Sequence, residues 1–112
     1  MISAFSSSAS GIKASFRMMD ASAHNTANIN TDGYKKQTVI MNETGSGVVV
    51  TLGRDYSAGP YYQKNGTVIE GSNSEYTQEA VSRITAVNML KANTAAFRCA
   101  DEMQRCTLDI KA

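Results

Sequence analysis

Two cysteines and a single histidine are the residues of this 112-residue chain best suited to chemistry. Cys99 and Cys106 are seven residues apart in a stretch with helical periodicity, which separates them by roughly 10 Å along the axis. The Cα atoms of a disulfide lie closer than that, so we expect no bond between the two. The sequence has no C-x-x-C pattern and no further ligand set for zinc. We therefore expect both thiols to pack as small apolar side chains in a buried stripe.

The surroundings of these residues also argue against catalysis. His24 lies one turn after Asp20 and is expected to be a polar residue at a helix end. A metal site or a catalytic triad needs further ligands or a nucleophile, and none is near in the sequence. A nucleophilic cysteine needs a base and an electropositive setting, which an apolar stripe does not offer. The glycines from 45 to 53 lack the pattern of a phosphate loop. We expect no enzymatic activity, metal, cofactor or small-molecule substrate.

Composition limits the remaining classes of protein. A chain of 112 residues with a formal net charge of +1 fits one domain, and 42% hydrophobic residues permit a core. The absence of a basic cluster argues against nucleic acid as a partner. No apolar run approaches the roughly 18 residues of a membrane span. The segment Met1–Phe5 lacks a basic region followed by a long apolar one, so we expect no cleaved signal peptide.

The first 27 residues have the period of one long helix. Its apolar residues are spaced 3, 4, 3, 4, 3, 4, a heptad stripe that favours a coiled-coil seam over an ordinary amphipathic helix on a globular core. Serines occupy the other faces and allow a second helix to approach closely. Because serine is an indifferent helix former, we expect this segment to need a partner. The stripe is Ile2, Phe5, Ala9, Ile12, Phe16, Met19 and Ala23.

A second helix is predicted from residue 73 to 112, and it carries two apolar stripes. One can pair with the first helix of the same chain, and the other then needs a partner from outside, unless one thick core covers both. The first stripe is Met89, Ala92, Ala96, Cys99, Met103, Cys106 and Ile110, and the second contains Val87, Leu90, Phe97 and Leu108.

The middle segment, 36–72, has a different character. Val39–Met41, Val48–Leu52 and Thr67–Glu70 are β-branched runs separated by glycines. Asn65-Gly66 fits a two-residue turn, which predicts a hairpin over 61–70. The predicted fold is mainly α with a small β part: two long terminal helices packed antiparallel as a coiled-coil-like hairpin and joined by this segment. The predicted units within one domain are 1–35, 36–72 and 73–112.

The stretch from Ala27 to Lys35 joins the first helix to the β segment. Asn28, Asn30 and Thr31 are turn and cap residues, since their short side chains hydrogen-bond nearby backbone. Gly33 takes a positive φ at no steric cost, which suits a helix exit. We therefore predict a helix end followed by a sharp turn that is hydrogen-bonded to itself.

The same stretch resembles the N-terminal motif of the bacterial flagellar rod and hook family, which reads roughly A-N-x-x-T-x-G-Y. Its fixed positions are met by Ala27, Asn28, Thr31, Gly33 and Tyr34. The C-terminal region resembles the small proximal rod proteins of that family, with Ser74 and Glu75 departing from the usual valine and aspartate. The segments that carry this second resemblance are Ser72–Glu75, Ala92-Asn93, Asp101–Met103 and Leu108–Ala112.

This resemblance implies a structural subunit of the flagellar basal-body rod, located in the periplasmic space and exported by the flagellar type III apparatus. Its partners would be copies of itself and other rod or hook proteins. The terminal helices would fold on assembly into a tubular wall. The alternative from the residues alone is a soluble helical adaptor, similar to an export chaperone, that binds a partner helix in a groove.

Overall fold

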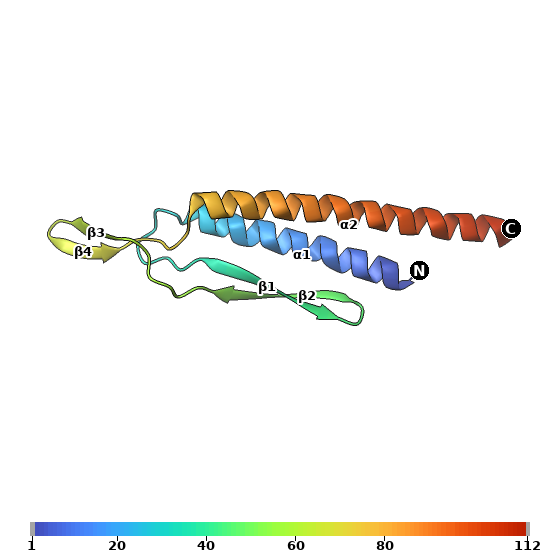
Figure 1. Cartoon of the computed structure of the whole chain (residues 1–112), viewed down its shortest axis with the longest axis horizontal. Helices are drawn as coiled ribbons and strands as arrows, with labels where there is room; N and C mark the ends of the chain where they lie inside the picture. The colour runs from blue at the N-terminus through green and yellow to red at the C-terminus, as the bar shows by residue number, and fades with distance from the viewer. Residues whose placement is uncertain (1, 112) are drawn as a thin grey trace.

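Two long helices and two β-hairpins make up the molecule (Figure 1). The computed structural model describes residues 2–111, and side chains from 2 to 110. The elements in order are α1 (Ile2–Ala27), β1 (Gln37–Thr44), β2 (Gly47–Arg54), β3 (Tyr61–Lys64), β4 (Thr67–Glu70) and α2 (Tyr76–Lys111). The predicted fold class, mainly α with a small β part, is confirmed. Helix α2 begins three residues later than predicted.

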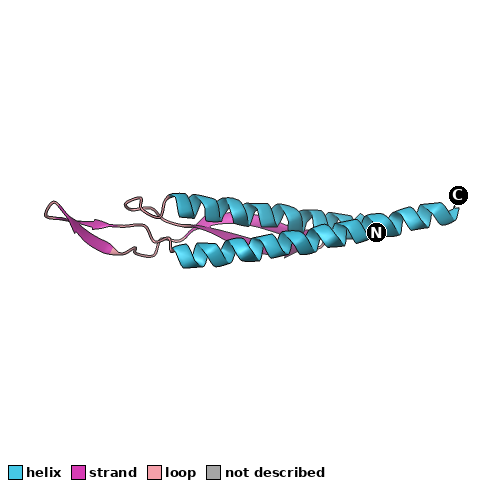
Figure 2. Cartoon of the chain, turned by 90° about the horizontal axis from the view of Figure 1, so that it is seen from above, coloured by secondary structure: helices cyan, strands magenta, loops and turns pink. Residues whose placement is uncertain are grey.

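The shape is that of a rod rather than a globule (Figures 1 and 2). The principal extents are 78 × 22 × 13 Å and the radius of gyration is 19.7 Å. A compact domain of this length has a radius of gyration of about 13 Å. The chain therefore has little interior, and its few buried side chains carry most of the packing.

The two helices run antiparallel, side by side (Figures 1 and 2). The rings of Phe5 and Phe97 meet edge to face with centroids 5.0 Å apart. A Cβ placed on Gly11 would collide with the side chain of Asn93. The register places Ile2 beside the stretch around Ala100, so the last residues of α2 extend past α1.

Small residues form the seam, by which we mean the line of contact between α1 and α2. The buried apolar residues of the described chain are Ala14, Ala21, Ala86 and Ala100. The largest fully buried side chains belong to Ser15 and Ser22, and their hydroxyls donate to the Gly11 carbonyl at 2.9 Å and the Glu79 carbonyl at 3.0 Å. Such residues let two helix backbones lie close together without leaving buried polar groups unpaired.

The apolar stripes do not form this seam, so the predicted packing within the chain is wrong for most of their residues. Phe16 is 52% exposed, Met103 60% and Ile110 88%, and Ile2 is also exposed. Ile12, Met19, Met89 and Leu90 are half-buried at its margins, and Phe5 and Phe97 pack on each other. The reason is geometric: Ser8, Gly11, Ser15, Ser22 and Asn25 repeat with compatible heptad spacing and allow a closer approach than phenylalanine does.

Strands β1 and β2 form an antiparallel hairpin that lies along α1, on the side away from α2 (Figure 1). Their register runs from Gln37 opposite Arg54 to Thr44 opposite Gly47. Serines attach the hairpin to the helix: Val48 N–H donates to Ser10 Oγ at 3.0 Å, and Ser6 Oγ donates to the Ser46 carbonyl at 3.3 Å. The middle segment is therefore a third layer against α1 as well as a connection.

Strands β3 and β4 form the hairpin predicted around Asn65-Gly66. Asn65 has φ +51° and Gly66 has φ +80°, as a tight turn with two left-handed central residues requires. Among the described residues neither strand packs against a helix or against the other hairpin. The β3–β4 hairpin therefore projects alone from the end of the molecule opposite to the termini (Figure 1).

The small-residue seam predicts a strong dependence on position for one substitution. Ala14→Leu adds bulk where the side chain has no exposed surface, and should lower the free energy of unfolding by about 1–3 kcal/mol. Ala23→Leu, at an exposed site on the same helix, should change it by less than about 0.5 kcal/mol. Denaturant unfolding of the monomer followed by circular dichroism measures both. Equal midpoints for the two variants would contradict this packing.

Candidate assembly surface

The turn after α1 has the predicted geometry. Asn28 Nδ2 donates to the His24 carbonyl at 2.9 Å, and Thr31 Oγ1 donates to Asn28 Oδ1 at 3.1 Å. Gly33 has φ +68°, and its N–H donates to the Glu70 carbonyl at 2.8 Å. Ala27 and Asn30 are exposed. The motif thus ends α1, and the bond from Gly33 holds the end of β4 beside the turn. The role of the motif in assembly remains a prediction.

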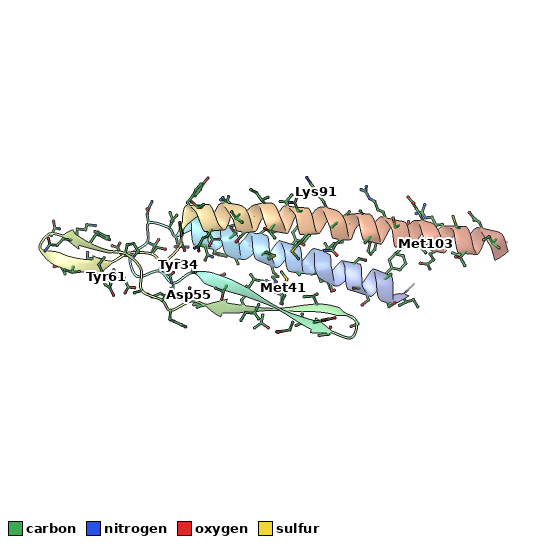
Figure 3. The ribbon with its side chains drawn as sticks, viewed as in Figure 1. Tyr34, Met41, Asp55, Tyr61, Lys91 and Met103 are labelled. Carbon is green, nitrogen blue, oxygen red and sulfur yellow. The ribbon has the colours of Figure 1, made fainter. Side chains whose placement is uncertain are left out.

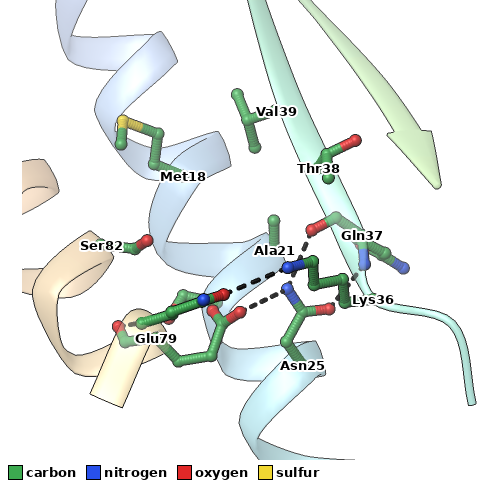
Figure 4. A pocket seen from close by; sticks show the side chains of 11 residues that line it. Met18, Ala21, Asn25, Lys36, Gln37, Thr38, Val39, Glu79 and Ser82 are labelled. Atoms are coloured by element: carbon green, nitrogen blue, oxygen red, sulfur yellow. Dashed lines mark hydrogen bonds between the residues drawn. The ribbon is translucent and has the colours of Figure 1, made fainter. Parts of the chain in front are cut away.

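The buried side chain of Asn25 is the centre of a polar hub, which we define as Asn25, Tyr34, Gln37 and Glu79. Figure 4 shows Asn25, Gln37 and Glu79. Its Nδ2 donates to the Gln37 carbonyl at 2.9 Å and to Glu79 Oε1 at 3.0 Å. Its Oδ1 accepts from Gln37 N–H at 2.7 Å and from Tyr34 OH at 3.1 Å. One amide thereby satisfies all its donors and acceptors and joins α1, β1, α2 and the turn.

The phenol of Tyr34 stays a hydrogen-bond donor in this setting. Burial raises the pKa of Tyr34, Arg54 opposes that shift and the carboxylate of Glu79 adds to it. The hydroxyl therefore remains protonated at neutral pH and can keep its bond to Asn25. Tyr34 of the turn motif therefore helps to hold the side chain of Asn25 in place.

Asn73 is a second connecting amide, just before α2. Its Nδ2 donates to the Asp55 carbonyl at 2.8 Å and the Ser57 carbonyl at 3.1 Å, and its Oδ1 accepts from Lys36 N–H at 2.6 Å. The sequence did not predict the roles of Asn25 and Asn73. The signal available was an asparagine inside a helical pattern and another before a helix, both poor helix formers.

Glu70 fastens the base of the β3–β4 hairpin to the turn motif. Its Oε1 accepts from Lys35 Nζ at 2.6 Å and from Gly59 N–H at 2.8 Å. The hydrogen bond from Lys35 and then that from Gly59 hold the pKa of Glu70 below its ordinary value of 4.5. Tyr62 OH also donates to Asp32 Oδ1, and this bond raises the pKa of Tyr62. The hairpin is therefore held at its base and at Tyr62, and no helix or other strand of the described residues packs against it.

A cleft of about 260 Å³ lies between α1, β1 and the start of α2 (Figure 4). Asn25, Glu79 and Lys36 contribute its polar wall, and Met18 and Val39 its apolar one. Lys36 Nζ is already engaged by Gln78 Oε1 at 3.1 Å and Asp55 Oδ2 at 3.6 Å. Within residues 2–111 no cluster of three or more histidine, cysteine or acidic residues is arranged to hold a metal.

Both cysteines are free and exposed, so the predicted burial of Cys99 and Cys106 is wrong within the chain. They belong to the stripe from Met89 to Ile110, of which only Met89 is half-buried, because Ala86 and Ala100 occupy the contact with α1. Among the helices described, none is long and apolar enough to cross a membrane. The exposed thiols are thus part of a surface that is apolar and free of neighbours.

A larger apolar area, the lateral face, spans both helices on the side away from the β1–β2 hairpin. Phe5 touches Phe97 across the pair, and residues seven apart lie above one another on a helix. Ile12 and Met19 therefore follow Phe5 along α1, as Leu90 precedes Phe97 on α2. Phe16 and Val87 lie next to these rows and are 52% and 38% exposed. The lateral face is Ile12, Phe16, Met19, Val87, Leu90 and Phe97.

No protein-family model and no curated protein matches the chain. The function must therefore be argued from the surfaces themselves. The lateral face and the end of α2 carry large exposed apolar side chains on a chain with a small core, and contiguous exposed apolar patches mark contacts with other proteins. The polar hub joins α1, β1 and α2, and Asn73 joins the loops next to them, so the helices that carry these apolar side chains are held in place.

The polar hub predicts that Asn25→Asp is destabilising. The change removes the donor to Gln37 and places a second carboxylate beside Glu79, so the free energy of unfolding should fall by at least about 1–3 kcal/mol. The loss should be larger at neutral than at acidic pH, because protonation relieves the repulsion between the carboxylates. Asn30→Asp, at an exposed site of the motif, is the control. If both variants unfolded at the same denaturant concentration, the hub would not contribute to the free energy of unfolding.

The attachment of the β3–β4 hairpin should weaken in acid. Because the pKa of Glu70 is lower in the folded chain, its stabilisation is present above the ordinary value and is lost as the pH falls through the folded one. Wild type should therefore be more stable than Glu70→Gln at about pH 7, and the difference should disappear as the pH falls below the ordinary value and through the folded-state pKa. The amide resonance of Gly59 should follow the same titration by NMR. If the difference in stability between the two variants persisted in acid, it would come from the shape of the Glu70 side chain and not from its charge.

Proposed function

We propose that this chain is a structural subunit that assembles with copies of itself through its helices, as a component of a flagellar basal-body rod. The observation that carries the proposal is that large apolar side chains lie on the surface while serine and alanine fill the interior. The accessible surface is 7607 Å², against roughly 6000 Å² for a compact monomer of this mass. A chain of this kind completes its burial only by association.

The driving force for association is available on the lateral face. Transfer of each large aliphatic or aromatic side chain from water to a packed interface stabilises by up to about 1.5–3 kcal/mol. Phe16 and Val87 are exposed and Ile12 is half-buried on this face, so a neighbouring helix can cover several apolar side chains at once. The rod shape supports the same proposal, because elongated subunits stack side by side into a wall.

The resemblance of the turn motif adds the biological setting. The segment from Ala27 to Tyr34 that resembles the rod family is also the segment that directs the chain from α1 into the hairpins. In the proposed function the partners are further copies of the chain, other rod and hook proteins, and the flagellar type III export apparatus. The proposed location is the rod in the periplasmic space.

Sedimentation and circular dichroism over a range of concentration test the proposal together. We expect a monomer of modest helicity that gains helix as it enters large species, because burial on assembly supplies what the serine-rich α1 lacks. A monomer or dimer that is fully helical at every concentration would contradict it and favour the helical adaptor.

Substitutions on the lateral face should separate assembly from folding. Phe16→Asp and Val87→Asp place a charge in the proposed contact and should raise the concentration needed for assembly by at least about tenfold, while the monomer keeps its helicity. Asn88→Asp places the same charge at the neighbouring exposed position and should assemble as wild type does. Normal assembly of both lateral-face variants would show that this face is not the contact.

A further inference from the structure

The carboxylate of Glu79 is buried without a counter-charge. Glu79 is 5% exposed, and its Oε1 accepts a hydrogen bond from Asn25 Nδ2 at 3.0 Å. No ion pair among the described residues includes Glu79. A carboxylate removed from water is costly unless a cation or several donors meet it. The polar hub therefore compensates this negative charge only in part.

The second oxygen of this carboxylate opens into the cleft between α1, β1 and the start of α2. Among the described residues, Ser74 Oγ is the one fully buried side-chain oxygen or nitrogen without a hydrogen-bond partner. Glu79 Oε2 has no partner within this part of the chain either, so it is not fully buried. Because Glu79 lines the cleft, the remaining exposure of this oxygen is toward the cleft (Figure 4).

The cations near Glu79 are engaged elsewhere. Lys36 Nζ lies 3.6 Å from Asp55 Oδ2, at the base of the β1–β2 hairpin (Figure 3). Arg83, one turn after Glu79, donates its Nε to the backbone carbonyl of Glu79, and its guanidinium lies over the ring of Tyr76, 5.9 Å from the centroid. Asp55 thus neutralises Lys36, and Glu79 keeps its own charge at the cleft.

The other walls of the cleft suit a cation on an alkyl stem. Ser82 lines the cleft three residues after Glu79, on the same face of α2, so its hydroxyl oxygen is a second acceptor near the carboxylate. Met18 and Val39 supply an apolar wall along which methylene groups can pack (Figure 4). The volume of about 260 Å³ is below the roughly 300–1000 Å³ typical of small-molecule sites, so the cleft suits a group the size of one side chain.

We propose that this cleft binds a guanidinium group carried on an alkyl stem, as on an arginine side chain. A guanidinium is planar and presents its N–H donors in a fixed fork, so it can donate to Glu79 Oε2 and to the Ser82 hydroxyl together. It also supplies the positive charge that the carboxylate lacks. The inference goes beyond the proposed function and does not require assembly, because every wall of the cleft belongs to one copy.

Titration of the monomer with butylguanidinium tests the site, and butylurea, which has a similar shape without the charge, is the control ligand. At millimolar concentration, below the molar range in which guanidinium denatures, butylguanidinium should shift the side-chain amide resonances of Asn25. It should also raise the thermal midpoint of unfolding, because a ligand that binds the folded chain stabilises it. Butylurea should do neither. Equal effects of the two compounds would overturn the proposal, and so would the absence of any effect of butylguanidinium.

Two variants locate the binding. Glu79→Gln keeps an oxygen that can accept from Asn25 but removes the charge, and should weaken the binding of butylguanidinium by at least about tenfold. Ser82→Ala removes the second acceptor and should weaken it severalfold, and this variant decides alone if Glu79→Gln does not fold. Glu75→Gln, at an exposed position outside the cleft, should bind as wild type does. Unchanged binding to the cleft variants would assign the effect to an adventitious contact elsewhere and overturn the site.

Sedimentation with and without butylguanidinium distinguishes the source of the group. An arginine of another copy, such as the exposed Arg17, would compete with the ligand, so the ligand should then raise the concentration needed for assembly. Assembly that is unaffected by bound ligand would assign the site to a guanidinium group from outside the assembly. A chain that binds butylguanidinium and never assembles would overturn the proposed function and leave this site standing.

Discussion

The close approach of α1 and α2 is the constraint on which the rest of this structure depends. Gly11 lies so near Asn93 that a Cβ would collide with its amide, the buried apolar residues are all alanines, and the largest fully buried side chains are serines. Because no bulky side chain fits between the backbones, the phenylalanines, isoleucines and methionines are displaced to the edges and the outside. The exposed apolar surface follows from the same packing that holds the helices together.

Polar contacts supply the specificity that small side chains lack. Serine and alanine offer few shapes that distinguish one helix register from another, whereas a buried amide with four hydrogen bonds to three residues tolerates only one arrangement. Asn25 fixes the end of α1 against α2 and β1, and Asn73 fixes the loops that lead to the hairpins. The result is a thin molecule whose ends are well defined although its core is small.

Much of this fold is readable from local pattern. The two helices, the β-branched strands, the Asn65-Gly66 turn and the positive φ of Gly33 follow from periodicity and backbone chemistry, and the structure has all of them. The residues predicted to form the seam are wrong because the apolar stripe and the serine stripe of α1 share heptad spacing. Which of them faces α2 depends on how closely the partner can approach, and that is a property of the pair. For the same reason the sequence did not predict exposure of Cys99 and Cys106 or the bond of Asn25 to Glu79, 54 residues away.

The composition of the seam has a thermodynamic consequence. The heat capacity change of unfolding comes mainly from apolar surface exposed to water, and a seam of serine, glycine and alanine holds little of it. The isolated chain should therefore have a flat stability curve, with stability that varies little with temperature. The larger negative heat capacity change would then accompany association, when phenylalanine, isoleucine and valine leave water. Polymers built on such contacts strengthen on warming from the cold and loosen on chilling, because hydrophobic burial weakens as temperature falls.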